Sequence, residues 1–372
     1  MDHEADGQTS LANARLTIDL GALVANWRTL AALAPGSEMS AVVKANAYGI
    51  GVDRAVPALA TAGCRTFFVA TVAEGLEVRS LAPDTIVYIL DGLPPGSAAA
   101  LAGQRLRPVL GTPREIAEWA AWKRQGGEGD CAVHFDTGMN RLGLGPDDTA
   151  DFVRDPSLTT ILSPALVMSH LACADVPEDP LNPAQLARFR EVLARVPSVP
   201  ASLVNSAGIY LGAKYHFAVC RPGIMLYGGR GPLDRAPLRT VVTAEARVLA
   251  VRSVAAGTPV GYGAAERTRK TSVLATLGVG YADGYHRLAG SSDARLGGTV
   301  FVRGRRAPLI GRVSMDLAVA DVTSVPGVAA GDWAELFGPS IPLDEAASAA
   351  ATIGYEFLTS LGRRYERRYI GG

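Results

Sequence analysis

Eight short apolar runs, separated by helix-like stretches, constrain the fold of this chain more than any other feature. Residues 113–125 and 182–196 are typical of the intervening stretches, since they are rich in Ala and Leu and carry charges at helical spacing. Short strands alternating with helices predict a parallel sheet, and a count of eight favours a closed (β/α)8 barrel over an open doubly wound sheet. The runs are 39–44, 66–70, 85–90, 107–110, 131–136, 161–170, 201–205 and 217–221.

A different pattern begins near Arg239. Strand-like segments separated by Gly and Pro turns follow, with one helix-like segment at 343–354, and they predict a mostly β second domain. We therefore expect a flexible tail over 1–14, a barrel domain over 15–238 and a β domain over 239–372. The stretch 228–237 is the predicted linker, and the strand-like 15–19 is expected to pair with the second domain.

Charge and cysteine content narrow the classes of function. Lys and Arg number 36, as do Asp and Glu, so bulk charge attracts neither nucleic acid nor an anionic membrane. No apolar run approaches the roughly 20 residues that span a bilayer, and the acidic start does not resemble a signal peptide. Four widely spaced cysteines indicate free thiols in a reducing compartment, so the sequence predicts a cytoplasmic protein. They are Cys64, Cys131, Cys173 and Cys220.

Polar side chains follow five of the eight predicted barrel strands. Because the active site of an α/β barrel lies at the carboxyl ends of its strands, we expect these groups to share one mouth. A desolvated lysine amine becomes nucleophilic, and loops after strands seven and eight often bind phosphate, here through Ser206 and the amides of Gly223 and Ile224. Taken singly, each group also fits a surface charge, a core histidine or a helix cap. The groups are Lys44, Arg141, His170, Ser206 and Arg221.

Motifs of other enzyme classes are missing from the sequence. There is no GxxxxGK[ST], HExxH or GxSxG pattern, and the glycines of 278–284 have the wrong spacing for a dinucleotide loop. No group of His, Asp and Glu has the spacing of metal ligands, so no metal site is predicted.

Nine short motifs occur in an order that resembles the alanine racemase family. They are AVVKANAYG, DTGMNRLG, MSHLACAD, NSAG, RPGIMLYG, VGYG, GVGYADG, GRVSMD and TIGYE, and the resemblance runs from about Leu16 to Tyr369. It implies an α/β barrel followed by a β domain, and a homodimer with shared active sites. It also implies a pyridoxal 5'-phosphate enzyme that interconverts L- and D-alanine and so supplies D-alanine for bacterial peptidoglycan.

The resemblance assigns roles to individual residues. Lys44 would hold pyridoxal phosphate as a Schiff base and act as one proton-transfer base, and Tyr262 of the other subunit would be the second base. Arg221 would face the pyridine nitrogen, and His170 would orient Tyr262 and Arg221. The other residues implied in cofactor binding are Tyr48, Arg141, Ser206, Gly223, Ile224 and Tyr355.

Substrate contacts are implied in the same way. The backbone of Met315 and the side chain of Arg141 would bind the substrate carboxylate, and the entrance would be formed by Tyr281, Tyr355, Asp175 and Arg312. One position departs from the family pattern. Where many relatives carry a carbamylated lysine that braces the active-site arginine, this chain has His134, so either an anion replaces that brace or nothing does.

Three other readings remain open from the sequence. A racemase of broader range, acting on serine or other amino acids, would share these motifs. A barrel-type decarboxylase that uses the same cofactor would be expected to place an acid, not Arg221, at the ring nitrogen. A non-catalytic cofactor carrier would not need the residues after Arg239.

Overall fold

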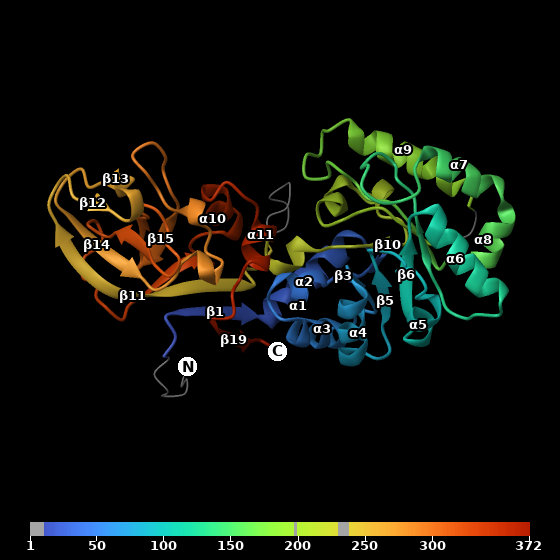
Figure 1. Cartoon of the computed structure of the whole chain (residues 1–372), viewed down its shortest axis with the longest axis horizontal. Coiled ribbons are helices and arrows are strands. Elements are labelled where there is room, and N and C mark those ends of the chain that lie inside the picture. Colours follow the sequence, from blue (N-terminus) through green and yellow to red (C-terminus); the bar gives the residue numbers. More distant parts are fainter. Residues whose placement is uncertain (1–10, 197–198, 230–237) are drawn as a thin grey trace. The chain divides into compact units, whose positions relative to one another are not determined.

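The computed structural model describes residues 11–196, 199–229 and 238–372 (Figure 1). The chain divides into two compact units. One unit contains the chain up to Asp19 together with Thr240–Gly371, and the other contains Leu20–Arg239 with the terminal Gly372. Most of the predicted tail and the predicted linker, 1–10 and 230–237, lie outside the described residues.

A curled parallel sheet forms the centre of the Leu20–Arg239 unit. Its strands follow chain order from β3 to β9, with Ala41 opposite Phe67 and Val167 opposite Ala201 at its two ends. Most of their residues are buried, as expected for parallel strands whose two faces are both covered. The strands are β3 (Ala41–Val42), β4 (Thr66–Val69), β5 (Ile86–Ile89), β6 (Leu106–Leu110), β7 (Ala132–His134), β8 (Leu166–Met168) and β9 (Ala201–Ser202).

The eighth predicted run forms the short strand β10 (Val219–Cys220). It pairs in parallel with β2 (Glu38–Met39), which precedes β3 by one residue. Its backbone is hydrogen-bonded on both sides, since the amide of Ala218 donates to the Ala201 carbonyl at 2.9 Å and Ser40 donates to Cys220 at 3.1 Å. Strand-like backbone therefore continues from β9 through β10 to β2.

The prediction for residues 161–170 was too long. Helix α8 (Pro156–Leu162) occupies the start of this run, and strand β8 begins only at Leu166. The helix ends at Ser163 in a left-handed conformation with φ 43°. Pro164 explains this end, because a proline disfavours the right-handed helical conformation in the residue before it.

Helices connect the strands of this unit, and the described residues include no helix that is both long and apolar enough to cross a membrane. Trp119, Phe67, Phe68 and Phe189 are among the largest fully buried side chains. Besides α8, the helices are α1 (Leu20–Leu33), α2 (Lys44–Tyr48), α3 (Val52–Thr61), α4 (Val72–Leu81), α5 (Ala98–Gly103), α6 (Pro113–Arg124), α7 (Pro146–Arg154) and α9 (Leu181–Leu193), with 3-10 turns η1 (Ala207–Leu211), η2 (Ala213–Tyr215) and η3 (Ile224–Tyr227).

The other unit is built mainly of antiparallel strands around the 13-residue strand β11 (Val242–Val254). Strand β1 (Ala14–Asp19) lies between β11 and β19, antiparallel to the first and parallel to the second (Figure 1). The predicted segment 343–354 forms α10 (Leu343–Ala349). The remaining elements are β12 (Pro259–Val260), β13 (Glu266–Arg267), β14 (Ser272–Leu277), β15 (Thr299–Val302), β16 (Arg305–Pro308), β17 (Ala318–Asp321), β18 (Trp333–Phe337), α11 (Gly354–Thr359) and β19 (Glu366–Ile370), with turns η4 (Tyr262–Ala264), η5 (Tyr281–Asp283) and η6 (Arg287–Ala289).

Candidate active site

Lys44 lies at the carboxyl end of β3, and the backbone after it takes an unusual path. Ala45, Asn46, Ala47 and Tyr48 all have left-handed conformations, with φ between 51° and 54°. Gly49 follows with φ 85°. Left-handed backbone costs an L-residue about 1–2 kcal/mol per position, so such a run persists only where the surroundings impose it.

Several contacts impose this left-handed turn. The amide of Gly49 donates to the Ala45 carbonyl at 2.8 Å, and the Asn46 side chain accepts from the amide of Val52 at 2.8 Å. Tyr48 is buried and stacks on Tyr227 with ring centroids 4.6 Å apart. The turn is thus packed on one side while half-buried Lys44 is held at its start.

Ser206, Gly223 and Tyr48 converge beside this turn. The amide of Gly223 donates to the Ser206 hydroxyl at 2.7 Å, and a β-carbon on Gly223 would collide with the Tyr48 hydroxyl. Ile224 begins the short turn η3 directly after Gly223. Two hydroxyls and a glycine amide at one point form the kind of cradle that accepts a phosphate group.

Arg221 is fully buried and is held by hydrogen bonds to its guanidinium. Nη1 donates to the Ser202 hydroxyl, while Nη2 donates to the Ser169 carbonyl at 2.7 Å. Nη2 also lies 3.2 Å from His170 Nδ1. Burial lowers the pKa of Arg221 to about 10, so this guanidinium stays charged at neutral pH.

The two histidines near Arg221 are neutral at pH 7. Burial lowers the pKa of His170 well below its usual value, and the charges of Arg221 and Arg141 add to the effect. Burial and the charge of Arg221 lower the pKa of His134 to about 4. Because His170 Nδ1 faces an N–H donor, its proton is assigned to Nε2, which leaves Nε2–H free to donate.

Arg141 is exposed and lies in a loop after β7 whose conformation is set by Asp136. One Asp136 oxygen accepts from the amides of Gly138 and Met139 at 2.8 Å, and the other accepts from Asn140 at 2.8 Å. We did not identify Asp136 from the sequence, although an aspartate before Thr-Gly is a recognisable turn signal.

Gln185 is a second residue that we did not identify from the sequence. It is fully buried on α9 and donates to the His170 carbonyl at 2.9 Å and to the Thr137 hydroxyl at 3.3 Å. It therefore joins the loop that carries Arg141 to the segment that carries His170. A glutamine inside a helical stretch gives no local signal for such a role.

A second group of predicted residues lies in the other unit, along the segment 312–315. A β-carbon on Gly263 would lie 3.0 Å from Arg312 Nη1, so the turn that carries Tyr262 runs beside Arg312. The amide of Ala282, next to Tyr281, donates to the Met315 carbonyl at 3.0 Å. Tyr262 is 73% exposed and Met315 is 54% exposed.

Two further predicted residues are exposed, and each lies in a different part of the sequence from the groups above. Asp175 follows β8, and Tyr355 lies at the start of α11. Lys44, Tyr48, Arg141, His170, Ser206 and Arg221 belong to one unit, whereas Tyr262, Tyr281, Arg312, Met315 and Tyr355 belong to the other.

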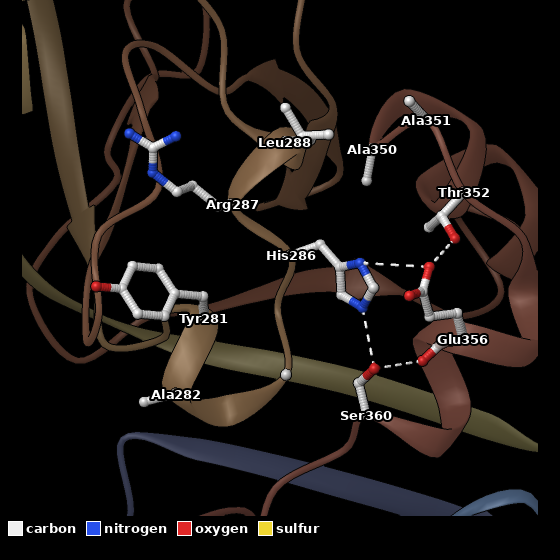
Figure 2. Close-up of a pocket in the computed structure, with 11 residues that line it drawn as sticks. Tyr281, Ala282, His286, Arg287, Leu288, Ala350, Ala351, Thr352, Glu356 and Ser360 are labelled. Carbon is white, nitrogen blue, oxygen red and sulfur yellow. Dashed lines mark hydrogen bonds and ion pairs between the residues drawn. The ribbon is translucent and has the colours of Figure 1, made fainter.

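A hollow of about 460 Å³ in the unit that contains Thr240–Gly371 is lined in part by Tyr281, Arg287 and Leu288 (Figure 2). Inside it, His286 Nε2 lies 3.0 Å from the Ser360 hydroxyl, and His286 Nδ1 lies 4.0 Å from Glu356 Oε2. This arrangement does not make Ser360 a nucleophile, because its hydroxyl donates to the Glu356 carbonyl at 2.5 Å. The hydroxyl proton is thus directed away from the histidine.

The cysteines offer no reactive thiolate in the buried core. All four are free, as the sequence predicted. Burial raises the pKa of Cys64 and of Cys131 to about 12, so both remain protonated thiols at neutral pH. Within the described ranges, no three His, Cys, Asp or Glu side chains lie together as a metal site would need.

Comparison with known proteins identifies the family. The N-terminal domain of alanine racemase matches residues 18–231 and its C-terminal domain matches 241–369. Alanine racemases of Methylobacterium nodulans and Rhizobium meliloti are 50% and 48% identical, covering 98% and 97% of this chain and 98% of each relative. The crystal structure of alanine racemase from Bartonella henselae with covalently bound pyridoxal phosphate has a TM-score of 0.92 at 40% identity, covering 96% of this chain and all of that chain. This chain therefore belongs to the alanine racemase family.

Proposed function

We propose that this protein is a pyridoxal 5'-phosphate-dependent alanine racemase, which interconverts L- and D-alanine and supplies D-alanine for peptidoglycan. The observation that carries the proposal is the placement of Lys44 beside a phosphate cradle and a buried, charged arginine. The Methylobacterium and Rhizobium relatives are alanine racemases by name, and the Bartonella enzyme carries the cofactor covalently. We also propose a cytoplasmic location, where free thiols are the stable form.

The residues present fit the cofactor. Lys44 would hold it covalently, while Tyr48, Ser206 and the amides of Gly223 and Ile224 would bind its phosphate. The convergence of hydroxyls on Gly223, where a β-carbon would collide, supports this assignment. When bound, the cofactor supplies a conjugated ring that delocalises the charge left when the α-proton of alanine is removed.

Arg221 would face the ring nitrogen of the cofactor. A guanidinium that stays charged donates a hydrogen bond and disfavours a second positive charge beside it. Arg221 would in this way favour quick return of the proton to the α-carbon over side reactions. This role separates a racemase from a decarboxylase, for which an acid is expected at that position.

Two bases on opposite faces suit the reaction, because racemisation removes a proton from one face of the α-carbon and returns one to the other. We assign Lys44 and, from a partner subunit, Tyr262. The high exposure of Tyr262 supports a role at a subunit interface. His170 accepts from Arg221 at Nδ1 and would donate from Nε2 to the Tyr262 oxygen.

The remaining residues would bind and admit the substrate. Arg141 and the backbone of Met315 would bind the carboxylate of alanine, and Arg141 would also contact the phenolic oxygen of the cofactor. Tyr281, Tyr355, Asp175 and Arg312 would line the entrance. We propose a homodimer with two shared sites, in which each site takes residues of the Leu20–Arg239 unit from one subunit and residues of the Thr240–Gly371 unit from its partner.

We also propose that the parallel sheet closes into an eight-stranded barrel. The backbone hydrogen bonds of Ala218 to Ala201 and of Ser40 to Cys220 support closure through β10 and β2. A closed barrel would bring the segments after β3 and β10 together, with Lys44 near Gly223.

The test is incubation of purified protein and cofactor with L-alanine, followed by chiral chromatography. We expect D-alanine to form until the two enantiomers are equal. Parallel reactions with L-serine and L-lysine measure the substrate range. Cofactor bound through Lys44 with no D-alanine formed would reject the proposed reaction.

Dimerisation provides a second test. Concentration-dependent activity, followed together with light scattering, should show racemisation only where dimers are present. A monomer is expected to bind the cofactor through Lys44 and to lack activity. A monomer that racemises alanine would exclude the assignment of Tyr262 as a base supplied by the partner.

A further inference from the structure

The pattern Thr-x-x-Glu occurs twice directly after a strand of the parallel sheet. Thr71 and Glu74 begin α4 after β4, and Thr112 and Glu115 begin α6 after β6. In both cases the threonine hydroxyl accepts from the glutamate amide at 3.3 Å. Each glutamate carboxylate then reaches back across the end of the sheet to a loop that follows the preceding strand.

Glu74 reaches the residue directly after Lys44. Its Oε1 accepts from the amide of Ala45 at 2.7 Å, while Oε2 accepts from the amides of Ala70 and Thr71 at 2.8 Å and 3.2 Å. Ala45 is the first left-handed residue of the turn after β3. The carboxylate therefore fixes the peptide plane that joins Lys44 to this turn and ties it to the end of the neighbouring strand.

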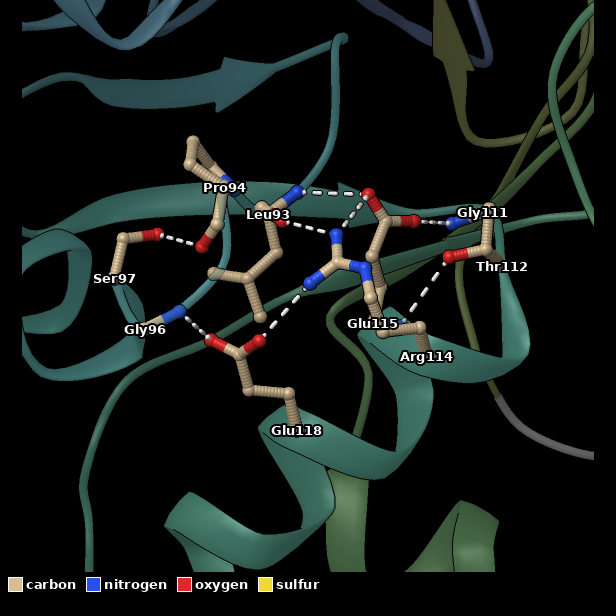
Figure 3. Close-up of polar contacts among 9 residues, drawn as sticks. All are labelled: Leu93, Pro94, Gly96, Ser97, Gly111, Thr112, Arg114, Glu115 and Glu118. Carbon is tan, nitrogen blue, oxygen red and sulfur yellow. Dashed lines mark hydrogen bonds and ion pairs between the residues drawn. The ribbon is translucent and has the colours of Figure 1, made fainter.

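Glu115 makes the same kind of bridge at another place (Figure 3). Its Oε1 accepts from the amide of Leu93 at 3.0 Å and its Oε2 accepts from Gly111 at 2.8 Å. It is more buried than Glu74, and a β-carbon on Gly92 would collide with its carboxylate. The loop that it holds, 91–97, carries none of the residues assigned to the reaction.

We propose that Glu74 is a positioning residue for Lys44, which rests on the proposed cofactor-binding role of Lys44. A carboxylate suits this place because three amide N–H groups point at it and all of them need acceptors. A glutamine at the same place offers one acceptor oxygen and one N–H₂ group. The N–H₂ group would then face an amide N–H, which places two donors against each other. The amide of Ala45 would either lose its acceptor or share the one remaining oxygen with the amides of Ala70 and Thr71.

The experiment compares Glu74→Gln with the matched control Glu115→Gln. Four properties are measured for wild type and both variants: melting temperature, cofactor dissociation constant, pH dependence of the bound cofactor's absorbance, and hydrogen exchange of peptides covering 45–51. The fraction of Lys44 that can be trapped on the cofactor by borohydride is read by mass spectrometry. Only wild type needs an activity assay for this comparison.

We expect Glu74→Gln to weaken cofactor binding by up to about tenfold, because a turn without its anchor must be ordered when the cofactor binds, at a cost of up to one hydrogen bond to a charged acceptor. The variant should also shift the pH dependence of the bound cofactor's absorbance and lower the fraction of Lys44 trapped by borohydride. Hydrogen exchange over 45–51 should be faster than in wild type. Glu115→Gln should lower the melting temperature at least as much. Its dissociation constant, titration and exchange over 45–51 should match wild type.

Equal changes in both variants, or none in Glu74→Gln beyond its loss of stability, would overturn the inference. Failure of the proposed function would give a different result: the wild-type protein would neither bind the cofactor nor convert alanine. The exchange measurement on the protein without cofactor then still reports whether Glu74 orders the turn.

Discussion

The two units hold the residues assigned to the site in opposite ways. In the Leu20–Arg239 unit, Arg221 and His170 lie in a buried network that also includes Ser202 and Gln185. In the other unit, Tyr262 and Met315 are largely exposed. Buried polar groups are costly to leave unpaired, whereas exposed side chains change little in stability when replaced. Changes in the first group should therefore affect stability, and changes in the second should affect only the reaction.

Replacing Tyr262 by Phe should have the largest effect. Loss of a proposed proton-transfer group is expected to slow racemisation by about 10²–10⁴-fold. The melting temperature should stay within the error of wild type, because Phe keeps the ring and the side chain is exposed within its own chain. Chiral chromatography and thermal unfolding of the same preparation measure both. A marked loss of stability would show that Tyr262 is structural and would break the contrast between the units.

Arg221→Glu tests the buried side of the contrast. The variant can no longer donate to the carbonyls of Ser169 and Leu203, and each unpaired buried group costs about 1–3 kcal/mol. An acid beside the ring nitrogen should also increase transamination, which is measured as pyruvate formed from alanine in the presence of cofactor. Arg221→Lys is the control that keeps the charge. Pyruvate at the wild-type level in Arg221→Glu would refute the assigned role.

The free energy of unfolding should depend on pH through His134. Its pKa is about 4 in the folded chain, and an unfolded histidine titrates near 6.5. Below that value the unfolded chain binds a proton that the folded chain does not, so stability falls as the pH decreases from about 6.5 to about 4. Asn at this position should flatten the slope by up to about 1.4 kcal/mol per pH unit.

Urea unfolding at several pH values measures this slope. His170 contributes a change of the same sign and remains in the variant, so some slope is expected to persist. Identical slopes in wild type and His134→Asn would mean that the site does not hold His134 neutral.

Met315→Ala should have the smallest effect. If the backbone of this residue binds the carboxylate, removal of its exposed side chain should change KM less than about threefold and leave the melting temperature alone. Initial rates over a range of alanine concentrations give KM. A rise of tenfold or more would show that the side chain itself contacts the substrate.

Much of the fold could be read from the sequence because its signals are local. Buried parallel strands appear as apolar runs, and the runs around Phe67 and Val87 match β4 and β5 closely. The run at 161–170 was misread, since an apolar helix end and an apolar strand have the same composition, and only Pro164 separates them.

The residues proposed for the site could be named from the sequence, but their local geometry could not. Lys44 and Arg221 could be named because both follow strands, but the left-handed path of 45–48 could not, since Gly49 is its only glycine neighbour. Asn46 tolerates a left-handed conformation, but Ala45, Ala47 and Tyr48 give no sign of one. Glu74 accepts from the amide of Ala45, 29 residues away in the chain, and only the tertiary structure reveals this partner. Asp136 accepts from amides of its own turn, so its local sequence signal was overlooked.

The position of β1 has a consequence for synthesis of the chain. This strand is made first, yet both of its partners come much later, β11 after roughly 220 further residues and β19 at 366–370. At about 5–20 residues per second, β1 waits roughly 10–45 s on the ribosome before its first partner is made. The Leu20–Arg239 unit is a continuous segment that can fold during this interval, so Lys44 and the turn after it are in place before the sheet of the other unit is complete.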